Sequence, residues 1–162
     1  LRRLATSSHS ARKLADRVKF AVSLFCYNTY KYKPLFVDYL KGQQGINLNN
    51  ITKVDCKSGS FRFYQGKSPI HEVSVKNLAA YVHPGCGKCQ DFSGELSDIS
   101  IGHAGSDLGW CTVITRKPEA EKLVGELADS GILELKRDVP RLSELVGLSE
   151  AKRKRPAPYV RI

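Results

Sequence analysis

The sequence predicts a fold between α/β and α+β, in which a mixed sheet with a β-hairpin is flanked by helices and a cysteine-bearing loop lies at one end. Three observations support it. Residues 18–26 form an apolar run of strand length, residues 51–66 alternate around a Ser-Gly turn, and residues 118–130 place apolar side chains at helical spacing. At 162 residues, the chain is expected to form a single domain over 1–162.

Five elements are expected before the cysteine loop. In the order helix, strand, helix, hairpin and strand, they are residues 1–17, 18–26, 34–41, 51–66 and 71–75. The strand at 18–26 is apolar on both faces, which is typical of a strand covered on both sides in a parallel sheet. Pro34 suits the first turn of the second helix, and Gly42 and Gly45 are expected to end it. Ser58 and Gly59 form the hairpin turn.

Five further elements are expected after the loop. They are strands at 97–102 and 110–116, a helix from Pro118, a strand at 132–135 and a short helix at 140–146. The apolar stripe of the Pro118 helix is Ala120, Leu123, Val124, Leu127 and Ala128. Gly131 is expected to terminate that helix. Residues 150–162 are interpreted as a basic tail.

The charge balance favours an anionic partner. The net charge is +10 and the predicted pI is about 9.5, but the basic residues are spread along the chain. The run Lys152–Arg155 has the pattern of a solvated tail or helix end, so we expect no nucleic-acid partner from charge alone. No apolar run is long enough for a membrane span. Since the chain opens on Leu1 and contains no methionine, we expect a piece of a longer polypeptide.

The five cysteines indicate a reduced, cytoplasmic protein, because an odd number does not suit a disulfide framework. Cys86 and Cys89 lie in a Pro- and Gly-rich loop, which favours metal ligation over a thioredoxin-type pair at a helix start. Two ordinary loop thiols remain the alternative. Cys26, at the end of a predicted strand, is either a third ligand or a small core residue. Cys56 and Cys111 lie in strand-like runs and are expected to be core residues.

The segment after the thiols is rich in glycine. Gly102, Gly105 and Gly109 allow the backbone to approach a flat or phosphorylated ligand, although the spacing is not that of a dinucleotide-binding motif. An ordinary turn, with Trp110 in the core, is the alternative. Acidic residues in this segment, such as Asp98, are expected to cap turns.

The order of these features resembles the C-terminal domain of the coenzyme F420 hydrogenase/dehydrogenase beta-subunit family. The resemblance is carried by Leu24, Phe25, Cys26, the hairpin around Gly59, Cys86, Cys89, Asp91, Phe92, Glu95, Leu96, Asp98, Ile99, Ser100, Gly102, Gly105, Gly109, Trp110, Val113, Ile114 and Arg116. It extends from about Leu1 to beyond Leu133. Cys111 stands where the family often has threonine.

The resemblance implies an oxidoreductase domain of a larger protein or complex, containing FAD and a 4Fe-4S cluster. Electrons would pass between coenzyme F420, or ferredoxin, and a partner subunit or acceptor. The implied cluster ligands are Cys26, Cys86 and Cys89, with a fourth expected upstream of Leu1 and with Cys56 or Cys111 as poorer substitutes. The implied flavin contacts are Gly102, Gly105, Ser106, Gly109, Trp110 and Thr112.

Two other classes of function fit parts of the pattern. A zinc-stabilised basic module that binds nucleic acid would use the Cys86–Cys89 pair, but only one such pair is present where zinc sites usually combine two. A non-catalytic docking domain of an oxidoreductase would bind neither flavin nor iron.

Overall fold

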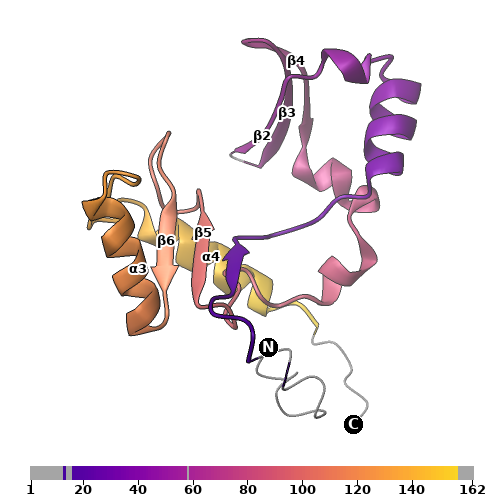
Figure 1. Cartoon of the computed structure of the whole chain (residues 1–162). Helices are drawn as coiled ribbons and strands as arrows, with labels where there is room; N and C mark the ends of the chain where they lie inside the picture. Colours follow the sequence, from indigo (N-terminus) through magenta and orange to yellow (C-terminus); the bar gives the residue numbers. More distant parts are fainter. Residues whose placement is uncertain (1–12, 14–15, 58, 157–162) are drawn as a thin grey trace. The chain divides into compact units, whose positions relative to one another are not determined.

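The computed structural model describes residues 13, 16–57 and 59–156 (Figure 1). The chain divides into two compact units, each with its own three-stranded sheet. The first unit is Leu1–Tyr27 together with Lys88–Ile162, and the second unit is Asn28–Gly87. The mixed α and β class predicted from the sequence is confirmed, whereas the single domain expected over 1–162 stays a prediction. The helix expected at 1–17 lies largely outside the described residues.

The sheet of the first unit has the strand order β1-β5-β6, with β1 parallel to β5 and β5 antiparallel to β6. Its strands are β1 (Val22–Leu24), β5 (Ile99–Gly102) and β6 (Thr112–Thr115). The long strand predicted at 18–26 is only three residues, and the prediction that both of its faces are covered is wrong for the described structure. Val22 and Leu24 share one face of β1 and are 59% and 73% exposed, so this face of the strand is largely open to solvent.

Helix α3 (Pro118–Asp129) forms as predicted and packs beside β6 (Figure 1). Ala120 is fully buried, and Gly131, at φ 73°, follows the helix end. The strand predicted at 132–135 is wrong. The amide groups of Ile132 and Leu133 instead donate to the carbonyl oxygen of Leu127, which closes the helix and leaves these N–H groups unavailable to a sheet.

Helix α4 (Leu142–Arg153) is longer than the short helix predicted at 140–146. The segment 150–162, interpreted as a basic tail, therefore begins inside this helix. Lys152, in the last turn, is only 2% exposed. That side chain belongs to the interior of the first unit.

The second unit combines an antiparallel sheet with four short helical segments. They are η1 (Lys33–Gln43), η2 (Leu48–Asn50), β2 (Lys53–Lys57), β3 (Ser60–Gln65), β4 (Ser68–Ser74), η3 (Val75–Tyr81) and η4 (Pro84–Lys88), the last crossing into the first unit. The predicted hairpin is confirmed as β2 and β3, with Gly59 at φ 76° in its turn, and the predicted strand at 71–75 is the later part of β4. The buried core consists of Leu35, Leu40, Phe63, Val73 and Leu78.

Helix η1 is wound more widely than an α-helix. At its end, the amide of Gln44 donates to the carbonyl of Tyr39, five residues back, at 3.0 Å. Gly42 lies inside the helix rather than ending it, and Gly45, at φ 69°, follows it. Within the described residues, no helix is both long and apolar enough to cross a membrane.

Candidate functional site

The three predicted cluster ligands lie on two units. Cys26 follows β1 and Cys89 follows η4, both in the first unit, whereas Cys86 lies on η4 within the second unit. Cys26 is exposed, and Cys86 and Cys89 are half-buried.

In the first unit, the segments that carry Cys26 and Cys89 adjoin each other. The amide of Cys26 donates to the carbonyl oxygen of Phe92 at 2.9 Å, and the ring of Phe25 lies 5.5 Å from that of Phe92. The Cys89 thiol lies 3.6 Å from the carbonyl oxygen of Asp91. Two cysteines far apart in the sequence are therefore carried on neighbouring backbone at the end of β1.

In the second unit, Cys86 is fixed by a turn. Its amide donates to the carbonyl of His83 at 2.9 Å, and its sulfur accepts a hydrogen bond from the amide of Thr29 at 3.2 Å. Hydrogen bonds to the sulfurs are one of the ways in which proteins tune thiolate-bound iron–sulfur clusters. The environment of Cys86 thus suits a ligating sulfur.

The donor chemistry fits an iron–sulfur cluster, because the candidate ligands are reduced thiols. Among the side chains that the structure describes, no group of three or more His, Cys, Asp or Glu is gathered closely enough to hold a metal ion. Cys26 and Cys89 belong to one unit and Cys86 to the other. The assignment of these three cysteines as cluster ligands stays a prediction.

The prediction that Cys56 and Cys111 are core residues is wrong, since both are exposed. Cys56 lies on β2, an edge strand, and pairs with Phe61 on β3 across the hairpin. The pKa of the Cys56 thiol is nevertheless raised, first by partial burial and then by the charge of Asp55. Cys111 lies just before β6, with its sulfur 3.6 Å from Nδ1 of His103.

All six predicted flavin contacts lie on the loop between β5 and β6 or at its two ends. The hydroxyl groups of Ser106 and Thr112 bind the backbone of this loop. Ser106 Oγ lies within hydrogen-bonding distance of the carbonyl oxygens of His103 (2.9 Å) and Trp110 (2.8 Å). Thr112 Oγ1 donates to the carbonyl of Ala104 at 2.8 Å. Both side chains are buried, so their described contacts stabilise the loop.

The three glycines of this segment differ in their surroundings. A Cβ on Gly102 would overlap the ring of Phe25, and one on Gly105 would lie 3.1 Å from Val139 Cγ1. Gly109 has nothing within 4 Å of its Cβ position. The ammonium of Lys136 lies 3.8 Å from the centroid of the half-buried Trp110 ring. Residues 107–109 are exposed and Trp110 is half-buried, so residues 107–110 are the open part of the loop.

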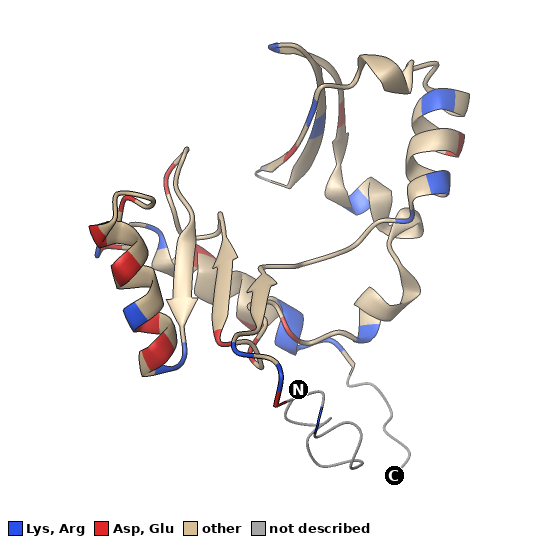
Figure 2. Ribbon diagram, viewed as in Figure 1, with Lys and Arg blue, Asp and Glu red and all other residues tan. Residues whose placement is uncertain are grey.

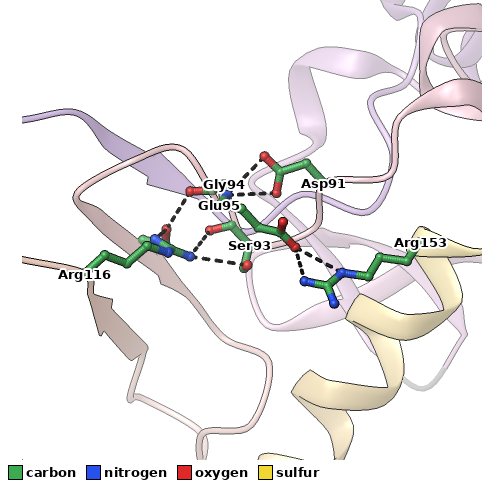
Figure 3. A network of polar contacts seen from close by, with 7 residues as sticks. Asp91, Ser93, Gly94, Glu95, Arg116 and Arg153 are labelled. Atoms are coloured by element: carbon green, nitrogen blue, oxygen red, sulfur yellow. Dashed lines mark hydrogen bonds and ion pairs between the residues drawn. The ribbon is translucent and has the colours of Figure 1, made fainter. Parts of the chain in front are cut away.

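Arg116 organises the backbone around the cysteine segment (Figure 3). Its guanidinium donates to Ser100 Oγ at 2.7 Å and to the carbonyl oxygens of Ser97 and Ser93, each at 3.2 Å. Sequence reasoning placed Arg116 in the motif without giving it a role. The sequence feature that could have indicated this role is a cation at the end of a predicted strand, in a chain with a serine-rich segment at 93–100.

Asp91 caps a turn, as expected, whereas the prediction that Asp98 caps a turn is wrong, because its carboxylate binds residues distant from its own turn. Both carboxylate oxygens of Asp91 accept the amide of Glu95 at 3.1 Å (Figure 3). Asp98 is buried, accepts the amide of Ala21 at 2.9 Å and pairs with the ammonium of Lys117 at 2.6 Å. These contacts hold the approach to β1 against β5 and the end of β6.

Comparison with known proteins agrees with this architecture. Residues 1–140 match the family described as the C terminus of the coenzyme F420 hydrogenase/dehydrogenase beta subunit. The chain is 30% identical over 136 residues to coenzyme F420 hydrogenase subunit beta of Methanothermobacter thermautotrophicus, covering 84% of this chain and 48% of that protein. It is also 28% identical over 140 residues to the coenzyme F420-dependent sulfite reductase of Methanocaldococcus jannaschii, covering 86% of this chain and 20% of that protein.

A solved structure shares the fold. A chain in the F420-reducing NiFe hydrogenase complex from Methanosarcina barkeri matches with a TM-score of 0.84 and 28% identity, over 95% of this chain and 54% of that chain. The chain thus spans about half the length of the hydrogenase beta subunit that it matches. The resemblance predicted from the cysteine and glycine motifs is confirmed: the chain belongs to the coenzyme F420 hydrogenase/dehydrogenase beta subunit family, within its C-terminal part.

Proposed function

We propose that this chain is the electron-transfer domain of a flavin- and iron–sulfur-dependent oxidoreductase, acting on coenzyme F420 as part of a larger protein or complex. The observation that carries the proposal is the adjoining placement of the Cys26 and Cys89 segments in a chain of this family. The relatives named for F420 hydrogenase and F420-dependent sulfite reductase support the same substrate class.

Cys26, Cys86 and Cys89 would hold one 4Fe-4S cluster. Such a cluster takes four ligands, so a fourth would come from another part of the full-length protein, with Cys56 or Cys111 as poorer substitutes. Cys56 and Cys111 are exposed, but neither has a place in the family motif. Cys26, Cys86 and Cys89 would therefore be three of the four ligands of the cluster.

FAD would lie along the open part of the loop between β5 and β6. Gly109 and Trp110 provide the accessible surface, while Ser106 and Thr112 stabilise the loop beneath them, and Gly102 and Gly105 allow it to pack closely. When bound, FAD supplies the ability to exchange a hydride with one partner and single electrons with another.

The charge of the chain suits its proposed partners. Lys and Arg positions occur in both units (Figure 2), and the net charge of +10 favours association with anions. The anionic deazaflavin coenzyme, an acidic ferredoxin or an acidic face of a partner subunit would each be attracted. A reducing cytoplasmic location is part of the proposal, since free thiols must persist.

The experiment is anaerobic purification of the full-length protein with its partner subunits, followed by measurement of iron, acid-labile sulfide, flavin and F420-dependent dye reduction. We expect about four irons and one flavin for each copy of this domain. A colourless protein with zinc and steeply salt-dependent nucleic-acid binding would establish the zinc module instead. A protein with neither iron nor flavin would indicate a docking domain.

A further inference from the structure

The basic run at the end of α4 is built into the cysteine-bearing part of the first unit. Lys152 is 2% exposed, and its ammonium donates a hydrogen bond to the backbone carbonyl oxygen of Cys26. Burying an ammonium group is costly unless acceptors replace the water that it loses. The side chain is therefore held in the interior by the backbone that carries Cys26.

A second cation of the run holds the next residue of the same backbone. The guanidinium of Arg155 donates to the carbonyl oxygen of Tyr27 at 3.0 Å, and its central carbon lies 4.4 Å from the centroid of the Tyr27 ring. Two successive carbonyl groups after β1, those of Cys26 and Tyr27, are thus bound by side chains of one short segment.

The same segment also binds the chain that follows Cys89. The side-chain amide of Gln90 donates to the carbonyl oxygens of Arg153 (3.1 Å) and Arg155 (2.6 Å). Arg153 pairs with Glu95 at 2.5 Å (Figure 3). The exposed Arg153–Glu95 pair contributes little by itself, but the Gln90 contacts join it to the Cys89 segment.

We propose that residues 152–155 form a C-terminal clasp, in which Lys152 and Arg155 are positioning residues that fix the segments carrying Cys26 and Cys89. The role as a support for a cluster rests on the proposed function, whereas the clasp itself rests on the contacts given above. A solvated basic tail would make none of these contacts. The clasp holds two of the three candidate ligands at a fixed separation before any cofactor binds.

The test is amide hydrogen exchange on the full-length protein in its metal-free, reduced form, with Lys152→Met and Arg155→Met compared with Lys154→Met. Lys154 lies in the same run and is exposed, so it provides a matched control. We expect exchange to accelerate by about tenfold or more in the peptides that contain Cys26 and residues 89–95, and to stay unchanged in β2–β4. Lys154→Met should leave both regions as in the wild type.

Iron content after anaerobic cluster loading provides the second readout. If Lys152→Met and Arg155→Met accelerate exchange locally and also lower iron content, the clasp and its role are both supported. If exchange accelerates but the wild-type protein binds no iron, the clasp stands and the proposed function fails. Exchange unchanged in Arg155→Met and in Lys152→Met, or changed equally by Lys154→Met, would overturn the clasp. Should Lys152→Met prevent folding, Arg155→Met decides alone.

Discussion

The ammonium of Lys152 donates a hydrogen bond to the backbone carbonyl of Cys26 across a separation of 126 residues. Helix α4 is long enough to bring its last turn to the end of β1, where the first candidate ligand lies. The basic run 152–155 and the segment that carries Cys26, which are far apart in the sequence, are therefore in contact within the first unit.

Replacing Arg116 with methionine should destabilise the protein. The guanidinium donates to Ser100, Ser97 and Ser93, and its loss leaves their acceptor groups without the cation. We expect the free energy of unfolding to fall by about 2–3 kcal/mol, measured by urea denaturation. Arg137→Met, at an exposed position, is the control, and equal effects of the two changes would contradict the role of Arg116.

Replacing Gly94 with alanine tests the packing of β1 against the loop that precedes β5. Gly94 has φ 64°, and its Cβ would overlap the Ser23 side chain. Gly131→Ala is the matched control, because Gly131 has φ 73° and open space around its Cβ position. We expect Gly94→Ala to cost about 1–3 kcal/mol more than Gly131→Ala in the same denaturation measurement.

Removing the side chain of Ser23 should relieve that overlap. In the Ser23→Gly background, the additional cost of Gly94→Ala should shrink toward that of Gly131→Ala. An undiminished cost in the double variant would show that contact with Ser23 is not the cause.

The open part of the β5–β6 loop can be separated from its packed part. Gly105→Ala should lower the melting temperature, because its Cβ would press on Val139 and on the carbonyl of Arg141. Gly109→Ala imposes a similar backbone strain, since Gly109 has φ 88° and Gly105 has φ 85°, but it adds a Cβ where no atom lies within 4 Å. We therefore expect reduced flavin content in the full-length protein with a smaller change in melting temperature. Full flavin content in Gly109→Ala would remove this loop from the proposed flavin site.

The carboxyl group of Glu72 should have a lower pKa than an ordinary glutamate. Its pKa lies below the ordinary value because Arg62, directly opposite on β3, donates a hydrogen bond to it, with a further contribution from Ser60. Since the folded-state pKa is the lower one, the stabilisation is complete above the unfolded-state pKa and is lost as the pH falls through the folded-state value. NMR titration should show a higher pKa for Glu72 in Arg62→Met, closer to the ordinary value but still lowered by Ser60, and an unchanged pKa in that variant would contradict the pairing.

Local patterns predicted the elements whose structure depends on near neighbours. Helix α3 and the β2–β3 hairpin follow from helical spacing and from a Ser-Gly turn. Burial depends on distant partners, which is why the exposure of Leu24 on an edge strand and of Cys56 on another was not predicted. The prediction of a strand at 132–135 was wrong because the amides of Ile132 and Leu133 bind the end of α3. The apolar composition of the segment does not indicate this contact.

The candidate site was predicted in the same uneven way. The spacing of Cys86 and Cys89 and the motif around Cys26 can be recognised from the sequence alone. The contact of Cys26 with Phe92 joins residues distant in the sequence, and the clasp consists of residues whose charge pattern indicates solvent exposure. Tertiary contacts of this kind leave no periodic signal.

The most direct test of the proposed electron-transfer role is cluster content in cysteine variants of the full-length protein purified without oxygen. We predict that Cys26→Ala, Cys86→Ala and Cys89→Ala each lose most of the iron and the broad absorption at about 400 nm, because each removes a cluster ligand. Cys56→Ala and Cys111→Ala, which remove exposed thiols outside the motif, should retain both. Full iron and colour in all three motif variants would contradict the account, as would loss of the cluster only in Cys56→Ala or Cys111→Ala.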